Sequence, residues 1–327
     1  MTDSPPPWLS VLVPARNVAP WLADALGSIL GQADAHVELL VLDDASTDTT
    51  FAIASAHAAR DPRVRVLGNT QAQGVAWCRN HLIENARGEY CWFVDADDQL
   101  ARGAMRALRS HVDRHAPDLV LCDYRTLHTG SGLHPGDWRR RVTFEGPRHD
   151  LASPERRLVG LLLAGQLHAW SKIARRECWS RVRFDEGHVF EDVAASLDLA
   201  IVATKVSYVA AGWIRYRQRE GSLVQALDAR TLHDRLRSLE AVLERTAGTE
   251  DASLRFASAY YRARGFAWLA RRLEVGEVDA SLRDAVRRSF RHQFPDRAVD
   301  VLDGCRRRGW HLRARRLARD LEPWFDR

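Results

Sequence analysis

The nine residues YCWFVDADD, Tyr90 to Asp98, contain the change of chemistry that decides the fold of this chain. An apolar run of strand length, Tyr90–Val94, is followed at once by three carboxylates, those of Asp95, Asp97 and Asp98. Carboxylates this close raise one another's pKa, so either a positive partner compensates them or the stretch is a well-solvated turn. The rest of the sequence has to decide between these two interpretations.

Strand-like and helix-like segments alternate up to about residue 125. Further apolar runs typical of strands cover Leu9–Val13, Val37–Leu42, Val64–Leu67 and Leu119–Cys122. Helical stretches lie between the strands at Pro20–Gly31, Asp48–Ala59, Val75–Ala86 and Arg102–His115. This alternation predicts an α/β fold with an open, mainly parallel sheet and helices on both faces.

Polar residues follow three of the predicted strands. They are Pro14, Arg16 and Asn17 after the first strand, Asp43 and Asp44 after the second, and Asp95, Asp97 and Asp98 after the fourth. The carboxyl ends of parallel strands meet at one edge of a sheet, which is where ligands bind in such folds. One such cluster would be an ordinary turn, but three at the same edge indicate a site.

The residue types at this edge suit a nucleotide diphosphate and a metal ion. A carboxylate such as Asp44 can accept the N3–H of a uracil or thymine ring, and a nearby helix N-terminus favours a diphosphate. Asp95 and Asp97 supply the oxygen ligands that Mg²⁺ or Mn²⁺ prefers when substrate phosphates complete its coordination. Because no GxGxxG follows the first strand, a dinucleotide-dependent dehydrogenase is disfavoured.

The chain is expected to divide into a tail at 1–8, a catalytic domain at 9–226 with halves at 9–125 and 126–226, and a helical region at 227–327. The second half is predicted to hold a loop at His128–Asp137, helices at Pro154–Leu163 and Asp192–Ala203, and strands at Val206–Val209 and Trp213–Tyr216. The helical region is predicted to contain four helices, at Arg230–Arg245, Ser253–Arg272, Ser281–Gln293 and Arg313–Leu321.

Composition favours a globular cytoplasmic protein. Hydrophobic residues make up 46% of the 327, and no apolar run approaches the roughly 20 residues of a membrane-spanning helix. The first residues lack the pattern of a signal peptide, and the five cysteines contain no CxxC pair. Reduced thiols rather than a disulfide framework are therefore expected.

The C-terminal end is strongly basic and leaves two interpretations open. Residues 287–319 contain 11 arginines and three aspartates, and Trp310, Ala314, Leu317 and Leu321 recur at helical spacing, with Trp324 beyond. A basic amphipathic helix of this kind can lie on an anionic membrane surface. The same apolar face can instead pack on the catalytic domain or on a second subunit. A nucleic-acid partner is not expected, because the predicted site is acidic.

The order of these motifs resembles that of the family-2 glycosyltransferases. The matching segments are Ser10–Pro14 with Asn17, Asp43-Asp44-x-Ser46-x-Asp48, Asn69 with Gly74, Arg79-Asn80, Asp95-Ala-Asp97-Asp98, Trp170–Ile173, Phe190–Val193 and Tyr216-Arg-x-Arg219 with Gly221-Ser222. The resemblance covers residues 8–225 and implies a GT-A fold, a nucleotide-diphospho-sugar donor and inversion at the anomeric carbon. Ser171 departs from the asparagine that is usual in the family.

The resemblance also implies roles for individual residues. Donor-binding roles fall on Pro14, Arg16, Asn17, Asp43, Asp44, Arg79 and Asp95, with Arg217 and Arg219 as candidate phosphate ligands. Asp97, with Asp95, would bind Mn²⁺ or Mg²⁺, which assists departure of the nucleotide as a Lewis acid. Asp192 would be the base, with Glu191 as the alternative or as an acceptor ligand, and Trp170 and Lys172 would contact the acceptor. His168 is expected to be structural.

The sequence thus predicts an inverting, metal-dependent glycosyltransferase of bacterial polysaccharide or glycoconjugate synthesis. A UDP-sugar is the favoured donor and a glycan or lipid-linked hydroxyl the acceptor, with possible attachment to the inner face of the membrane. The alternative is a catalytically silent sugar-nucleotide-binding or scaffold protein on the same fold. A phosphatase with an Asp-x-Asp nucleophile is disfavoured, because that motif would be expected on the first strand.

Overall fold

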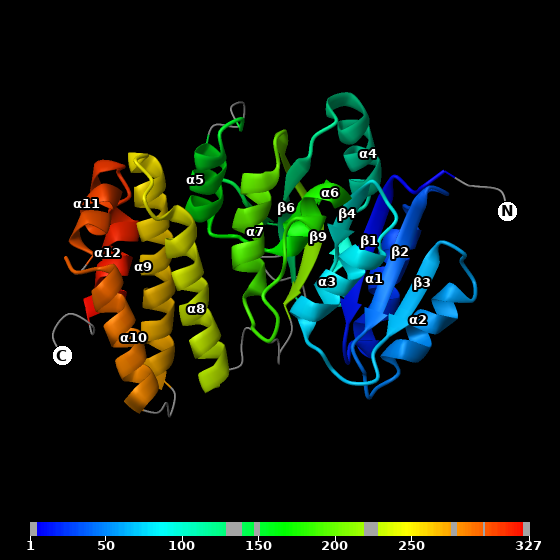
Figure 1. The fold of residues 1–327 in the computed structure, drawn as a ribbon, viewed down its shortest axis with the longest axis horizontal. Helices are drawn as coiled ribbons and strands as arrows, with labels where there is room; N and C mark the ends of the chain where they lie inside the picture. Colours follow the sequence, from blue (N-terminus) through cyan, green and yellow to red (C-terminus); the bar gives the residue numbers. More distant parts are fainter. Residues whose placement is uncertain are drawn as a thin grey trace.

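The computed structural model describes residues 5–128, 139–146, 151–218, 228–275, 280–296 and 298–322. Figure 1 shows a twisted sheet flanked by helices at one end of the molecule and a group of helices from the C-terminal third at the other. The α/β fold predicted from the alternating pattern is confirmed, as is the helical C-terminal region.

Four parallel strands form the half of the sheet that the N-terminal third of the chain contributes. These are β1 (Leu9–Ala15), β2 (Val37–Asp43), β3 (Val64–Gly68) and β4 (Tyr90–Phe93), in the order β3-β2-β1-β4. Every residue of β2 is buried, as expected for a strand covered by helices on both faces. Ala15 of β1 lies opposite Asp43 of β2, so the polar residues that follow both strands emerge side by side.

The other half of the sheet is mixed. It contains β5 (Gln99–Leu100), β6 (Leu119–His128), β7 (Arg140–Arg141), β8 (Lys172–Arg175) and β9 (Val206–Gln218). β8 lies between β4 and β6 and is antiparallel to both, whereas β6 and β9 are parallel. β9 is one strand where the sequence predicted two, because an irregularity in register opposite Cys122 and Asp123 interrupts the pattern but not the pairing with β6.

Helices cover the faces of the sheet. α1 (Ala19–Leu30), α2 (Thr50–Ala58), α3 (Val75–Asn85), α4 (Ala104–His115), α5 (Pro154–Ala164) and α7 (Glu191–Val202) agree with the predicted helices to within a few residues. The short α6 (Arg176–Ser180) and the 3₁₀ turn η1 (Ala169–Ser171) were not predicted, since segments of this length carry no helical periodicity.

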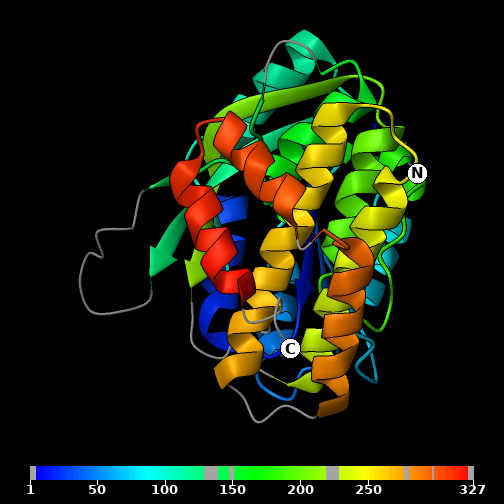
Figure 2. The same cartoon turned by 90° about the vertical axis from the view of Figure 1, so that its left-hand side faces the viewer.

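The C-terminal region consists of α8 (Ala229–Thr246), α9 (Ala252–Val275), α10 (Ala280–Gln293), α11 (Val299–Arg307) and α12 (His311–Leu321). α9 is the central helix and contacts α5, α8 and α12, an arrangement that Figure 2 shows from the side of these helices. α11 was not predicted as a helix. None of the helices described is both long and apolar enough to cross a membrane.

The apolar face of α12 packs within the chain. Ala314, Leu317 and Leu321 are buried, and the Trp310 ring lies 5.5 Å from the ring of Tyr260 on α9. This packing agrees with the interpretation in which the apolar face of the C-terminal helix lies against protein and not on a membrane surface. Trp324 lies outside the described residues, as does most of the predicted loop at 128–137.

Arg157 of α5 holds the C-terminal end of α7. Its fully buried guanidinium donates to the backbone carbonyl groups of Ala200, Ala203 and Thr204. It also donates to those of Leu151 and Ala152, which precede α5. The last carbonyl groups of a helix have no partner within the helix, and Arg157 supplies one to the end of α7.

We expect Arg157→Met to lower the free energy of unfolding by about 3 kcal/mol, because buried carbonyl groups lose a charged donor. Urea denaturation followed by circular dichroism measures this change. The matched control is Arg156→Met on the exposed side of α5, for which a change below about 0.5 kcal/mol is expected. Equal losses in the two variants would contradict the assignment.

Candidate active site

A cavity of about 1410 Å³ lies at the carboxyl ends of β1, β2 and β4 and extends to the C-terminal helices. Its lining includes Pro14, Arg16, Asp44, Arg79, Asp95, Asp97, Trp170, Glu191, Asp192 and Arg217 among the predicted site residues. The structure therefore brings together side chains that are up to about 200 positions apart in the sequence. α9 and α12, from outside the predicted catalytic domain, complete the wall.

Asn17 joins the loops that follow β1 and β2. Its backbone is in the left-handed region (φ 50°), its N–H donates to Ser46 Oγ at 2.9 Å, and its Oδ1 accepts from the Thr47 N–H at 2.8 Å. Asp48 adds a link, because its Oδ2 accepts from the Ala19 N–H at the start of α1. The Asn17 side chain thus holds the loop that presents Pro14 and Arg16 to the cavity.

Asp44 is buried at the edge of the cavity and binds the loop before α3. Its carboxylate accepts hydrogen bonds from Asn69 Nδ2 at 2.7 Å and from the N–H groups of Gln73 and Gly74, each at 2.8 Å. Burial opposes ionisation of Asp44, but these hydrogen bonds outweigh it and hold its pKa below the usual value. The side chain of Cys78 is also hydrogen-bonded to Asp44, so most of the roughly four acceptor positions of this carboxylate are used within the chain.

Asp43 lies behind Asp44 at the end of β2. Its Oδ2 accepts from the Ser46 N–H at 3.0 Å, while its buried Oδ1 has no hydrogen-bond partner among the described residues. Asp43 therefore shapes the turn that carries Ser46 to Asn17.

The three acids after β4 occupy different environments. Asp98 is fully buried and accepts the Arg217 N–H from β9 at 2.7 Å, whereas Asp95 and Asp97 line the cavity. Arg217 Nε also donates to the Asp97 carbonyl oxygen at 2.8 Å. Burial raises the pKa of Asp98 well above its usual value, and the charges of Asp95 and Asp97 add to that shift.

These acids fit a divalent cation that shares its coordination with a ligand. The second carboxylate oxygen of Asp98 is buried without a partner among the described residues, and burial together with Asp97 raises the pKa of Asp95 despite its pairing with Arg79. The described residues contain no group of three or more His, Cys, Asp or Glu side chains arranged to hold a metal ion. A cation at this loop would therefore take further oxygen ligands from a bound phosphate or from water.

Arg79 of α3 connects the acidic loop, residues 95–98 after β4, to the start of α7. One guanidinium nitrogen donates to Asp95 Oδ1 at 3.1 Å and another pairs with Glu191 Oε1. The group is 4% exposed and lies over the rings of Phe93 and Phe184. Burial opposes its charge, but the carboxylates of Glu191 and Asp95 prevail and raise its pKa.

The pKa values of Glu191 and Asp192 are shifted in opposite directions although the two residues are adjacent. Burial raises the pKa of Glu191 to about 7 against the pull of Arg79. Burial also opposes ionisation of Asp192, but the side chain of His168, with Arg79 and Lys172, holds the pKa of Asp192 below its usual value. His168 Nδ1 lies 3.8 Å from Asp192 Oδ2. Asp192 thus faces the cavity without a direct ion pair to arginine among the described residues.

His168 belongs to an aromatic stack that the sequence did not reveal. Its ring lies 4.5 Å from that of Trp170 and nearly parallel to it, and Tyr216 continues the stack 5.7 Å from Trp170. His168 Nε2 is 3.1 Å from Gln166 Oε1. Because the fold alone brings His168 to Asp192, the spacing of the sequence offered no signal for this pair.

Lys172, which follows the η1 turn, is fully buried. Its ammonium group donates to the His168 carbonyl oxygen at 2.7 Å and lies 3.2 Å from Ser171 Oγ. Burial lowers its pKa to about 8. The structure thus places Lys172 behind His168, whereas Trp170 reaches the cavity wall. Arg219, Gly221 and Ser222 lie outside the described residues.

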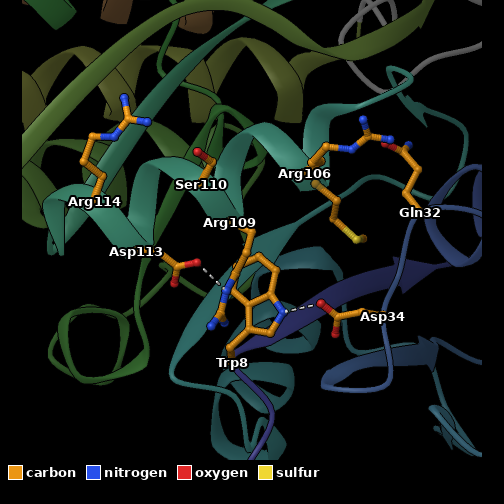
Figure 3. A pocket seen from close by; sticks show the side chains of 9 residues that line it. Trp8, Gln32, Asp34, Arg106, Arg109, Ser110, Asp113 and Arg114 are labelled. Atoms are coloured by element: carbon orange, nitrogen blue, oxygen red, sulfur yellow. Dashed lines mark hydrogen bonds and ion pairs between the residues drawn. The ribbon is translucent and has the colours of Figure 1, made fainter.

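A second cavity of about 660 Å³ lies beside α4, away from these residues (Figure 3). Its polar groups bind one another: Trp8 Nε1 donates to Asp34 at 3.3 Å and Arg109 pairs with Asp113 at 3.0 Å. None of the predicted site residues lines it. The larger cavity is therefore the candidate active site.

Sequence comparison finds similarity to one family in the N-terminal part. A family model described as "Glycosyl transferase family 2" matches residues 10–157. Glycosyltransferase GlyG of Streptococcus pneumoniae is 27% identical over 228 residues, which cover 66% of this chain and 73% of GlyG. The uncharacterized glycosyltransferase EpsJ of Bacillus subtilis is 28% identical over 236 residues, which cover 67% of this chain and 63% of EpsJ.

Solved structures share the fold over nearly the whole chain. Staphylococcus aureus TarS residues 1–349, in complex with UDP-GlcNAc, has a TM-score of 0.70 at 20% identity and covers 97% of this chain and 89% of that one. The mannosyltransferase PcManGT from Pyrobaculum calidifontis, in complex with GDP-Man and Mn²⁺, has a TM-score of 0.55 at 17% identity, covering 97% and 86%. The matched region includes the C-terminal helices as well as the sheet.

We expect Arg79→Met to lower the free energy of unfolding by about 3–5 kcal/mol near pH 8, because Asp95 and Glu191 are left buried without their cation. Unpaired buried carboxylates have raised pKa values, so the folded variant binds more protons than the unfolded chain and the loss shrinks as the pH falls towards 5. Urea titrations at several pH values measure this. Adding Glu191→Gln should recover part of the loss, and a loss independent of pH would contradict the bridge.

Proposed function

Because this chain is a family-2 glycosyltransferase of the GT-A fold, we propose that it transfers a sugar from a UDP-sugar to a hydroxyl group of a glycan or lipid-linked acceptor, with inversion, in bacterial polysaccharide or glycoconjugate synthesis. The observation that carries this proposal is the bridge from Asp95 through Arg79 to Glu191. The bridge joins the proposed donor-binding loop directly to the helix that begins with the two candidate bases.

Asp44 is the proposed ligand of the nucleotide base. Asp44 lines the cavity, and its lowered pKa keeps it an acceptor at neutral pH, so its carboxylate can take the N3–H of a uracil. Pro14 and Arg16 line the same end of the cavity, where an exposed guanidinium can reach a diphosphate. The UDP-GlcNAc bound by TarS supports a uridine nucleotide for this chain.

Asp97, with Asp95, is the proposed ligand of a Mn²⁺ or Mg²⁺ ion at the diphosphate. A divalent cation there supplies Lewis-acid neutralisation of the leaving nucleotide when bound. Arg217 positions the loop, since it donates to the Asp97 carbonyl oxygen while its N–H binds Asp98. The Mn²⁺ in PcManGT supports this choice of metal.

Asp192 is the proposed base that removes the proton of the acceptor hydroxyl. A single displacement with inversion needs the base on the face of the sugar opposite the leaving group, within hydrogen-bond reach of that hydroxyl. Asp192 lines the cavity and stays ionised beside His168, whereas Glu191 is committed to Arg79. We assign His168 the task of orienting Asp192, which revises the structural role expected from the sequence.

We expect Asp97→Asn to reduce sugar transfer by about a thousandfold, because the loop loses a charged metal ligand. The release of UDP from UDP-GlcNAc and other UDP-sugars with Mn²⁺ measures the effect, and thermal unfolding with donor and Mn²⁺ should lose the shift seen in the unchanged protein. Circular dichroism confirms that the variant is folded. Full activity of Asp97→Asn would refute the metal assignment, and no UDP release from any donor by the unchanged protein would favour the silent alternative.

The pH dependence distinguishes the two candidate bases. If Asp192 is the base, kcat/KM should hold well below pH 7 and fall only as Asp192 takes up a proton, because its pKa is lowered. His168→Asn should move this acidic limb to higher pH, since the interaction that lowers the pKa of Asp192 is lost. An acidic limb near pH 7 that is unaffected by His168→Asn would identify Glu191 instead.

A further inference from the structure

The described residues that line the active-site cavity fall into two groups of opposite charge. The first group follows the strands of the sheet and begins α3 and α7; it contains five carboxylates, those of Asp44, Asp95, Asp97, Glu191 and Asp192, and three arginines, Arg16, Arg79 and Arg217. The second group comes from α8, α9, α12 and the segment 139–146; it contains seven arginines, Arg141, Arg230, Arg235, Arg264, Arg271, Arg313 and Arg316, and the three acids Glu145, Asp228 and Asp320. We call these seven arginines the arginine wall. A divalent cation would balance the first group, whereas the second has an excess of positive charge among the described residues.

The three acids near the arginine wall form ion pairs with its arginines or accept a backbone hydrogen bond. Asp320 pairs with Arg271, Glu145 lies 3.5 Å from Arg313, and Asp228 accepts the Thr231 N–H at the start of α8. Arg264 and Arg230 instead donate to backbone carbonyl groups, at 3.3 Å and 2.8 Å. A carbonyl group orients a guanidinium without neutralising it, so these side chains keep their charge.

The wall is close to the proposed base. Phe190 immediately precedes Glu191, and its ring lies 6.2 Å from the ring of Trp268 on α9. Arg235 of α8 lies over the same Phe190 ring, 5.3 Å from its centre, and 3.3 Å from the hydroxyl of Tyr261. A molecule held by the wall therefore reaches the first turn of α7, where Asp192 faces the cavity.

We propose that the arginine wall binds the acceptor through phosphate groups, so that the substrate is a phosphate-bearing glycan or polyol and not a neutral oligosaccharide. This inference rests on the proposed transfer reaction. Guanidinium groups bind phosphate oxygens with two parallel hydrogen bonds, and the aromatic residues Tyr260, Tyr261 and Trp268 between the arginines offer apolar area for sugar or polyol carbon atoms. The phosphate comes either from phosphodiesters within a polymer or from the diphosphate of a lipid-linked sugar.

A fluorescent poly(glycerol phosphate) oligomer and a farnesyl-diphosphate-linked N-acetylglucosamine in detergent serve as probes of the two sources. Binding to the full chain is measured by fluorescence anisotropy for the oligomer and by calorimetry for the lipid. We expect one of the probes to bind and neutral dextran not to bind, with affinity falling as salt is raised because the contact is between exposed charges. The probe that binds identifies the source of the phosphate.

The double variant Arg264→Gln/Arg316→Gln should weaken binding of that probe by about tenfold or more, which corresponds to loss of about 1.4 kcal/mol. The matched control, Arg307→Gln/Arg315→Gln, removes the same charge from exposed positions on α11 and α12 that do not line the cavity, and should change affinity by less than about twofold. Equal effects of the two double variants would overturn the proposal. So would binding of neither probe, or tighter binding of single-stranded RNA than of both.

Donor binding is measured in parallel to separate this inference from the proposed function. The thermal shift caused by UDP-GlcNAc with Mn²⁺ should be the same in the unchanged protein and in Arg264→Gln/Arg316→Gln. A donor shift without probe binding overturns only the acceptor assignment. Probe binding that depends on the wall, without a shift or UDP release from any UDP-sugar, overturns the proposed transfer reaction and leaves a phosphate-binding surface.

Discussion

The buried guanidinium of Arg79 is the interaction on which the geometry of the cavity depends. It lies between two carboxylates from opposite sides of the site, Asp95 after β4 and Glu191 at the start of α7. A buried ion pair stabilises the folded chain little compared with apolar residues of the same volume, but removal of one partner is costly. Such a bridge therefore tolerates little change in the distance between its partners. It links the residues that follow β4 directly to the start of α7.

The bridge also gives Glu191 and Asp192 different surroundings. Glu191 is committed to Arg79, which leaves the adjacent Asp192 to face the cavity beside His168. Two acids at a helix start would ordinarily titrate as a pair, each raising the pKa of the other. Here their surroundings shift the two pKa values in opposite directions, and that is the usual physical sign of carboxylates with different roles.

The clustering of residues after β1, β2 and β4 could be predicted from the sequence, whereas the contribution of the C-terminal helices to the same cavity could not, for physical reasons. Asp44 and Asp95 follow apolar strands, and neighbouring parallel strands must bring their ends together, so local pattern sufficed there. The partnership of Arg79 with Glu191 spans 112 positions and that of His168 with Asp192 depends on β8, a four-residue strand with charged ends that has no recognisable pattern. The C-terminal helices were predicted from periodicity, but periodicity cannot show that the arginines of α9 and α12 line the same cavity as Asp97.

The C-terminal helices are therefore better understood as part of the unit that forms the cavity than as an attachment to it. Their apolar side chains are used internally, since Leu317 and Leu321 of α12 are buried and α9 packs on α5 of the preceding domain. The exposed arginines of these helices are then divided between those that line the cavity, such as Arg316, and neighbours such as Arg315 that do not. A general bias towards arginine explains the composition of the chain but not this placement in a concave wall next to Phe190. If the proposed reaction holds, positive charge gathered on this side of the cavity would help to select the second substrate, because an anionic acceptor would be attracted to the wall while the acidic residues after β4 would disfavour its binding in place of the donor.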